Sequence, residues 1–437
     1  MALKLRRSLT LFEAVFYGIG IIVGAGIYAL IGEAAGVAGN SIWMSFLIGA
    51  VIAVLTGLSY AELAAMFPSD AAEYVYVRKA YHSKFLGFIL SWLIIFTGIL
   101  SASTVALGFA GYFNSVIKFV FNFNFPLIIT AITMICFLSF VNFYGIKESS
   151  NLNILFSIIS IAGLIIFIVL AFASAGRLNV NYFERPNGFG GVFSAAILVF
   201  FAYIGFEEIV QISEETKSPK KMIPKAIMLT IAITTVLYIL VSFSVVSLVP
   251  WSDLQNIPNP LAFAASRSML GTNADLLVSI IALFATIGTV LVIIVATSRM
   301  IYGVAKEGAL PSILAKIHRK QKTPWIAATA VAVFAIMFLF VGKIERLANI
   351  TSLGAFITFA ATNLSLVWLR YTRPNIPRPF KVPLSIGKFA ILPFIGAIVC
   401  VFMIYKFDYL ELVIGIAILL SGAVVFHLRK NKIIFVD

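Results

Sequence analysis

The stretch Gly18–Tyr28, GIGIIVGAGIY, lies inside an apolar run long enough to cross a bilayer, yet four of its eleven residues are glycine. Each glycine costs a helix about 1 kcal/mol relative to alanine. A helix that only spans lipid gains nothing from concentrating that cost at its midpoint. Non-helical backbone at membrane depth is tolerated only where it lines a cavity or is covered by protein. The stretch therefore predicts an interrupted membrane helix whose free N–H groups form a ligand site. The alternative, left open by Gly20-x-x-x-Gly24, is close helix packing through small residues.

The remainder of the chain is almost as apolar. It is 61% hydrophobic and 11% charged, with a mean hydropathy of +1.04, whereas soluble domains carry about 25% charged residues. Apolar runs of about 20 residues each span a bilayer, so the chain is predicted to be an all-α membrane protein with twelve transmembrane helices and no cleavable signal peptide. The twelve runs lie near 11–36, 41–66, 84–113, 126–145, 150–176, 191–212, 225–250, 275–304, 325–341, 346–371, 388–405 and 408–428.

The net charge of +14 is a signal of membrane topology. With the N-terminus inside, the cytoplasmic segments hold 24 Lys and Arg and the external segments hold 7, with Arg299 inside a run. This excess is the positive-inside bias, and it predicts that both termini are cytoplasmic. The expected partner of the chain is therefore the lipid bilayer of the cell membrane rather than nucleic acid, and its oligomeric state stays open.

A second interrupted run repeats the first. Run 191–212 has Gly205 near its middle, followed at once by Glu207 and Glu208. It comes five runs after the first, so residues 11–176 and 191–371 are predicted to be inverted repeats within one domain, 1–437. Interruptions at corresponding positions of two repeats are the best sequence pointer to a transporter's binding site. Residues 388–428 then supply two additional helices.

The two breaks have complementary chemistry. Beyond Gly26 a half-helix restarts, and its first N–H groups have no helical partner, so they favour an anion such as a carboxylate. The first half of the sixth run ends near Phe201–Ala202, where unpaired carbonyls favour an ammonium group. Together they predict a site for a zwitterion such as an α-amino acid.

Six segments from the first run to the loop after the tenth resemble the signature stretches of the amino acid–polyamine–organocation family, and in particular its prokaryotic permeases related to cationic amino acid transporters. The resemblance implies a leucine-transporter-like fold of five plus five helices with a central amino acid site. The segments are IGIIVGAGIYAL, GLSYAELAAMFP, FFAYIGFEE, SEETKSPKKMIPKAI, AKEGALPSILAKIHRKQKTPWIA and RPFKVPL.

Site residues follow from the resemblance by motif. It implies that the backbone in the first run holds the substrate carboxylate and that carbonyls in the sixth run hold the amino group. An aromatic residue at the position of Phe201 packs over the substrate in similar permeases. The residues are Ile22, Gly24, Ala25 and Gly26 for the carboxylate, and Phe201, Ala202 and Ile204 for the amino group.

Two hydroxyl residues of the third run extend this site. Thr97 and Ser101 share one helix face at i, i+4 and are predicted to line the side-chain pocket; hydrogen bonds back to their own helix are the alternative. Thr286 and Thr289 are polar residues in the apolar eighth run. Some sodium-coupled relatives use hydroxyls on this helix for the ion, but two threonines give a sodium site little support.

Three other residues bear on coupling. Glu207 is an ionisable group inside the membrane, hence a functional candidate as proton acceptor or inner gate, with capping of the half-helix as the alternative. Some proton-coupled relatives have a lysine in the fifth run, where this chain has Ser160. This departure leaves the coupling mechanism open between proton symport, exchange and facilitated movement. Glu62 matches a family position, but an interfacial carboxylate paired with a loop cation explains it equally well.

Other classes of protein fit less well. No ATP-binding loop of the form GxxxxGK[ST] occurs, and no run carries a catalytic set or a metal-ligand cluster, so neither an enzyme nor a bound cofactor is expected. The two cysteines, Cys136 and Cys400, are expected to be buried structural thiols. The leading hypothesis is secondary active transport of amino acids by alternating access. An amino acid exchanger, a polyamine or organic amine transporter, a channel and a nutrient receptor are the alternatives.

Overall fold

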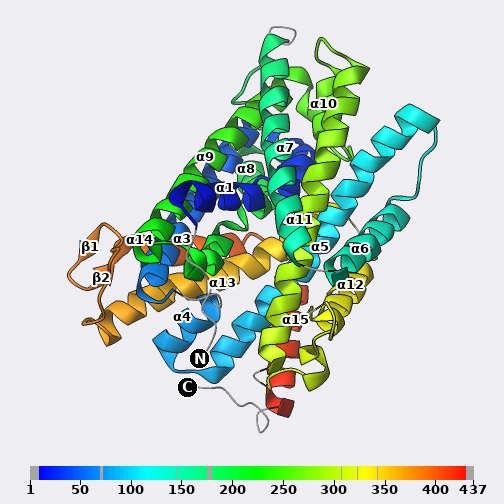
Figure 1. Cartoon of the computed structure of the whole chain (residues 1–437). Coiled ribbons are helices and arrows are strands. Elements are labelled where there is room, and N and C mark those ends of the chain that lie inside the picture. The colour runs from blue at the N-terminus through cyan, green and yellow to red at the C-terminus, as the bar shows by residue number, and fades with distance from the viewer. Residues whose placement is uncertain are drawn as a thin grey trace.

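The computed structural model describes residues 9–68, 72–144, 146–174, 180–306, 308–321, 323–341 and 343–429. Long helices surround two short pairs of helices that meet near the centre (Figure 1). The elements are α1 (Leu11–Ile22), α2 (Ala25–Ala38), η1 (Gly39–Ser41), α3 (Ile42–Met66), α4 (Ala72–Tyr81), α5 (Lys84–Phe121), α6 (Leu127–Tyr144), α7 (Ile146–Ala173), α8 (Gly188–Phe200), η2 (Phe201–Tyr203), η3 (Phe206–Glu215), α9 (Pro219–Leu248), η4 (Trp251–Asp253), α10 (Pro260–Ser266), α11 (Thr272–Lys306), η5 (Ser312–Ala315), α12 (Trp325–Leu339), α13 (Ile344–Thr372), β1 (Ser385–Ile386), β2 (Phe389–Ala390), α14 (Ile391–Ile404) and α15 (Tyr409–Arg429).

These helices confirm an all-α membrane protein. In the described part of the chain, eight helical stretches are long and apolar enough to cross a membrane, and four shorter apolar helices accompany them. Every one of the twelve apolar runs coincides with one of these helices or with a broken pair. The only strands described are β1 and β2, which form a two-residue antiparallel hairpin between α13 and α14.

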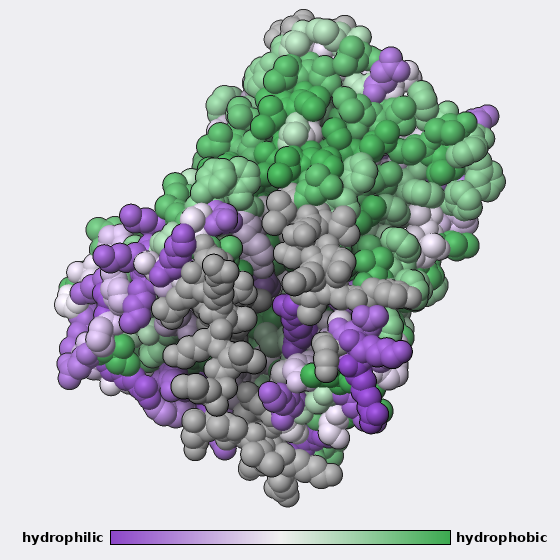
Figure 2. All heavy atoms as spheres, viewed as in Figure 1, coloured by the Kyte–Doolittle hydropathy of each residue, from purple (hydrophilic) through white to green (hydrophobic). Residues whose placement is uncertain are grey.

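The outer helices present apolar side chains outwards. On α15, Ile416, Leu420 and Val424 are exposed at four-residue spacing, while Gly415 and Gly422 on the opposite face are buried. A stripe of this kind suits a helix that faces lipid on one side and protein on the other. Figure 2 shows the apolar surface over the upper part of this view, and hydrophilic residues gathered below, around β1–β2.

The same outward exposure corrects one expectation about the cysteines. Cys136 on α6 is exposed, whereas Cys400 on α14 is buried. Large apolar neighbours of Cys136, Phe137 and Phe140, are 61% and 59% exposed. Cys136 therefore belongs to the apolar outer surface of α6 rather than to the core.

The first apolar run is interrupted where its glycines predict. α1 begins with a capping box, in which Thr10 Oγ1 accepts the Glu13 N–H and the Glu13 side chain accepts the Thr10 N–H. It ends at Ile22, and the chain leaves helical geometry at Val23 (φ −77°, ψ 58°) and Gly24 (φ −110°, ψ −141°) before α2 restarts at Ala25. The break leaves the first N–H groups of α2 without helical partners.

The sixth apolar run is also broken. α8 and the short η2 end at Tyr203, Ile204 is extended (φ −60°, ψ 132°) and Gly205 has φ +122°. A residue with a Cβ is strained at that φ, which is why the break needs a glycine. The continuation, η3, is a ten-residue 3₁₀ helix instead of the α-helical half that the sequence suggests.

The two breaks touch through these glycines. A Cβ on Gly26 would lie 2.6 Å from Ala202 Cα, and one on Gly205 would lie 2.6 Å from Ile21 Cγ2. Real side chains do not approach so closely, so both positions admit only hydrogen at the contact. Missing side chains thus let the backbone of the first run meet the backbone of the sixth.

A buried ionic network ties α3 to the end of α13. Glu62, fully buried, accepts two bonds from Arg370, Nε to Oε1 at 3.0 Å and Nη2 to Oε2 at 2.5 Å, and one from the Val382 N–H at 2.7 Å. Arg378 Nε lies 3.3 Å from Glu62 Oε1. The expected pairing with a loop cation is present in Arg378, and the loop also covers Glu62 through the Val382 N–H.

Replacing Glu62 by Gln should lower the stability of the protein by about 3–5 kcal/mol, because it leaves the Arg370 charge buried and unpaired. The measurement is thermal unfolding in detergent. Glu62→Leu combined with Arg370→Met removes both charges and should regain part of the loss. If Glu62→Gln unfolds at the same temperature as the wild type, the ion pair between Glu62 and Arg370 does not stabilise the fold.

Candidate functional site

A cavity of about 140 Å³ lies where the two breaks meet. Its wall is built by the broken helices on one side and by α5, α11 and α13 on the other, with α4 contributing one carboxylate. The lining residues are Gly20, Ile21, Ile22, Gly26, Glu73, Ile94, Thr97, Gly98, Ser101, Phe201, Ala202, Ile204, Gly205, Glu207, Glu208, Thr289, Val292, Ile293, Ala296, Thr297, Met300, Ala355, Thr358 and Phe359.

The first break supplies two of its four predicted residues to this wall, Ile22 and Gly26. Gly24 does not line the cavity, and the side chain of Ala25 lies outside the described part of the structure. Gly24 is instead packed so tightly that a Cβ would overlap the side chain of Thr289. Both residues still belong to the break, since Gly24 is the N-cap of α2 and Ala25 its first residue.

Hydroxyl groups from two other helices hold the carbonyls of the first break. Ser160 Oγ on α7 donates to Val23 O at 2.8 Å, and Tyr238 Oη on α9 donates to Ile22 O at 2.6 Å. Ser160 is buried and does not line the cavity. It therefore supports the unwound backbone from behind, at the position where some relatives have a lysine.

The second break supplies all three predicted residues, Phe201, Ala202 and Ile204. Phe201 O accepts the Ile204 N–H at 3.3 Å, and Ala202 O accepts the Tyr238 hydroxyl at 3.0 Å. A carbonyl oxygen has two lone pairs, so each of these oxygens keeps capacity for a further donor. This wall offers hydrogen-bond acceptors.

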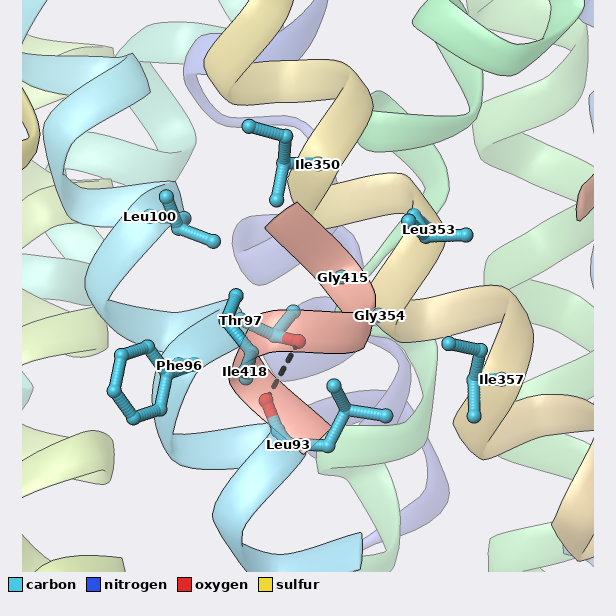
Figure 3. Close-up of a pocket in the computed structure, with 10 residues that line it drawn as sticks. All are labelled: Leu93, Phe96, Thr97, Leu100, Ile350, Leu353, Gly354, Ile357, Gly415 and Ile418. Atoms are coloured by element: carbon cyan, nitrogen blue, oxygen red, sulfur yellow. Dashed lines mark hydrogen bonds between the residues drawn. The ribbon is translucent and has the colours of Figure 1, made fainter. Parts of the chain in front are cut away.

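Both predicted hydroxyl residues of α5, Thr97 and Ser101, line the cavity. The Thr97 hydroxyl also donates to Leu93 O on its own helix at 2.9 Å, so the two alternatives for this residue are both realised. Figure 3 shows this bond beside a second, much smaller pocket of about 10 Å³ between α5, α13 and α15. That space is only about large enough for one water molecule and is lined almost entirely by apolar groups.

One face of α11 forms the opposite wall. Thr289, Ile293, Ala296 and Met300 recur at spacings of three and four residues, which keeps them on one side of a helix. Of the two threonines considered for sodium, Thr289 lines the cavity, whereas Thr286 is buried elsewhere and donates to Ala282 O at 2.7 Å. The sequence predicts a helix here, but its pattern of side chains does not indicate which face of the helix lies against the two breaks.

Carboxylates line the cavity at the end formed by η3. Glu207 accepts the Gly205 N–H at 2.9 Å, so it caps the break as the alternative expected. Glu208 lines the cavity too, although α-helical spacing favours a packing or surface role for it. No lysine, arginine or histidine lines this cavity in the part of the chain that the structure describes.

A third carboxylate, Glu73, reaches the cavity from α4 and was not singled out from the sequence. It is 6% exposed and accepts the Tyr60 hydroxyl at 3.0 Å. Burial raises the pKa of Glu73 above the usual range of a carboxyl group. Glu73 shares the buried face of α4 with Tyr76 and Val77, at i, i+3 and i+4. The sequence predicts a loop between two membrane runs here, so it does not indicate this face.

Known amino acid permeases and other transporters are similar to this chain in sequence. A family profile described as "Amino acid permease" matches residues 9–427. The chain is 30% identical to the branched-chain amino acid permease BcaP of Bacillus subtilis and 29% identical to the methylthioribose transporter of the same species, over 98% of this chain and 94% of each relative. It is 28% identical to cationic amino acid transporter 7 of Arabidopsis thaliana, over 86% of this chain and 68% of that protein.

Replacing Glu73 by Gln should stabilise the protein at alkaline pH and leave it unchanged in acid. The folded state raises the pKa of Glu73, so its stability falls as pH rises through that pKa and a charge must be buried. Gln resembles the protonated form and avoids this loss. Melting temperatures of both proteins, measured in detergent from acidic to alkaline pH, should separate only as pH rises; a constant offset would contradict the explanation.

Proposed function

The chain belongs to the amino acid permease family and is a transporter, not an enzyme, and we propose that it moves amino acids across the cell membrane by alternating access. The observation that carries the proposal is the meeting of two broken helices at one cavity. One break exposes the start of α2 and the other exposes the carbonyls that end η2. Backbone of opposite polarity is thus available to the two poles of one small zwitterion.

In this proposal the substrate carboxylate binds at the first break beside Ile22, where the Ala25 and Gly26 N–H groups begin α2; the Gly24 N–H is already donated to Ile22 O. The N–H groups and the positive end of the α2 dipole favour it there. The amino group binds the carbonyls of the second break, Phe201, Ala202 and Ile204, with the Phe201 ring packing over the substrate. The side chain points towards Thr97 and Ser101.

The charges that line the cavity limit which amino acid side chains a substrate can carry. Three carboxylates and no basic residue of the described chain line it. An acidic side chain would face three acidic groups and no basic group of the described chain that could neutralise it, which is costly in a space of low dielectric constant. The proposed substrates are therefore neutral or basic amino acids, and broad specificity accommodates both.

The proposed topology has twelve crossings with both termini in the cytoplasm. The inverted repeats are residues 11–176 and 191–371, followed by two additional helices at 388–428. The helix bounds and the excess of Lys and Arg in the intervening cytoplasmic segments support this arrangement. Movement then consists of rocking around the fixed site, as in other transporters with paired broken helices.

The proposed coupling ion is the proton, with Glu207 as its acceptor. Glu207 lies in the cavity wall next to the break and is bonded to the backbone of Gly205, so its protonation state bears directly on the site. Sodium is less well supported, because Thr286 does not line the cavity and Thr289 is the only one of the two threonines that does. Exchange of internal for external amino acid is the alternative.

Uptake into proteoliposomes tests the proposal. The purified protein is reconstituted and supplied with labelled leucine, arginine, alanine, glutamate and putrescine, with and without imposed proton and sodium gradients. Uptake of neutral or basic amino acids that rises with an inward proton gradient supports the proposal. Uptake only into vesicles preloaded with amino acid indicates exchange, and preference for putrescine indicates an amine transporter.

Gly26→Leu should abolish uptake while expression and membrane insertion remain, because any side chain at Gly26 collides with the Ala202 backbone inside the site. Gly303→Leu is a matched control in an apolar helix, since a Cβ at Gly303 meets nothing within 4 Å. Initial rates and yields of purified protein are compared. Near-normal uptake by the Gly26 variant would refute the assigned carboxylate site.

Glu207→Gln should flatten the pH dependence of uptake, since Gln keeps a hydrogen-bond acceptor for Gly205 but does not bind a proton. The measurement is the initial rate from pH 5 to pH 8 with clamped internal pH. Glu208→Gln serves as the neighbouring control and should retain the wild-type profile. An unchanged profile in the Glu207 variant would remove that residue from proton coupling.

A further inference from the structure

Tyr238 on α9 places a single hydroxyl between the two helix breaks. Its Oη lies 2.6 Å from Ile22 O of the first break and 3.0 Å from Ala202 O of the second. Both of these residues line the cavity, whereas Tyr238 is fully buried and does not. The hydroxyl therefore joins the two walls of the site from behind.

The aromatic ring fixes where this hydroxyl lies. The Tyr238 ring packs against Phe46 and Tyr203, with ring centroids 5.5 and 5.3 Å away. Buried side chains held in this way have little rotamer freedom. The position of Oη is thus set by α3, η2 and α9, and the carbonyls must adapt to it.

One proton cannot serve both carbonyls fully. A phenol donates a single hydrogen bond, and here two acceptors compete for it. Ile22 O also accepts the Gly24 N–H at 2.8 Å, so it keeps a donor when the hydroxyl turns to Ala202. An ammonium group that also donates to Ala202 O makes that oxygen a weaker competitor for the hydroxyl, so the Tyr238 O–H turns towards Ile22 O and strengthens its hydrogen bond there.

We propose that Tyr238 is a positioning residue that couples binding of the substrate amino group at the second break to the unwound end of α1. Its O–H turns between the Ala202 and Ile22 carbonyls as the site empties and fills, and the proton stays on the Tyr238 oxygen. Occupancy at one break thereby strengthens a hydrogen bond at the other. This coupling rests on the proposed function, which places the substrate amino group at the second break. The hydroxyl bridge between the two breaks does not depend on that function.

Tyr238→Phe tests this role, because it removes the hydroxyl and keeps the ring. We expect the KM for the carried amino acid to rise by up to about tenfold, the upper end of the effect of losing one hydrogen bond between neutral groups, with kcat within about twofold. Tyr112→Phe is the control. Tyr112 is equally buried and donates to Tyr28 O at 2.7 Å, another carbonyl of the first run, but it does not line the cavity or contact a break.

Deaminated analogues separate positioning from general damage. Inhibition of uptake is measured for leucine against 4-methylpentanoate, and for arginine against 5-guanidinopentanoate. If Tyr238 acts through the amino group, its loss lowers the preference for the amino acid over its analogue about tenfold, and Tyr112→Phe leaves the preference unchanged. Equal weakening of amino acid and analogue, or no weakening, would overturn the coupling.

Hydrogen exchange tests the bridge without any substrate. In detergent-solubilised protein, Tyr238→Phe should speed backbone exchange several-fold in peptides covering both breaks, and Tyr112→Phe should not. Unchanged exchange at the breaks would overturn the bridge. If the wild-type protein carries no amino acid under any gradient, the proposed function is overturned, whatever the hydrogen-exchange result. If the wild type carries amino acids and the Tyr238→Phe variant carries them with the same KM and the same preference over the analogues, only the coupling is overturned.

Discussion

A peptide group that leaves a helix in an apolar environment must find another partner, and this requirement shapes the centre of the molecule. Each buried polar backbone group that lacks a hydrogen bond costs about 2–7 kcal/mol in such surroundings. The structure meets part of the requirement with side-chain hydroxyls from helices far away in sequence, Ser160 and Tyr238. The peptide N–H and C=O groups that remain without a protein partner face the cavity, where a polar ligand can supply the missing hydrogen bonds.

Glycine makes this arrangement possible. At Gly205 it supplies a positive φ, and at Gly26 it removes the side chain that would separate two backbones. The same residues that weaken the helices thus bring their ends together. The cost in helix stability is offset by packing of the surrounding long helices and by buried contacts such as that between Glu62 and Arg370.

Much of this architecture was readable from the sequence, because hydrophobic length and glycine content act locally. The helix breaks at Ile22–Ala25 and near Gly205, and the cavity residues Phe201, Ala202 and Ile204, follow from local pattern and family resemblance. Features that depend on distant contacts did not follow. The folding of the 373–390 segment over Glu62, the arrival of Glu73 at the cavity and the Tyr238 bridge each join residues whose proximity no local pattern encodes.

The 3₁₀ form of η3 has a consequence for length. Ten residues of 3₁₀ helix extend about 20 Å, whereas the same residues as an α-helix extend about 15 Å. Rewinding η3 would shorten the segment by about 5 Å, nearly one α-helical turn, and would rotate its side chains about the axis. Because η3 packs against α1, α3 and α9, a change of this size at Glu207 and Glu208, in its first turn, would reach all three helices.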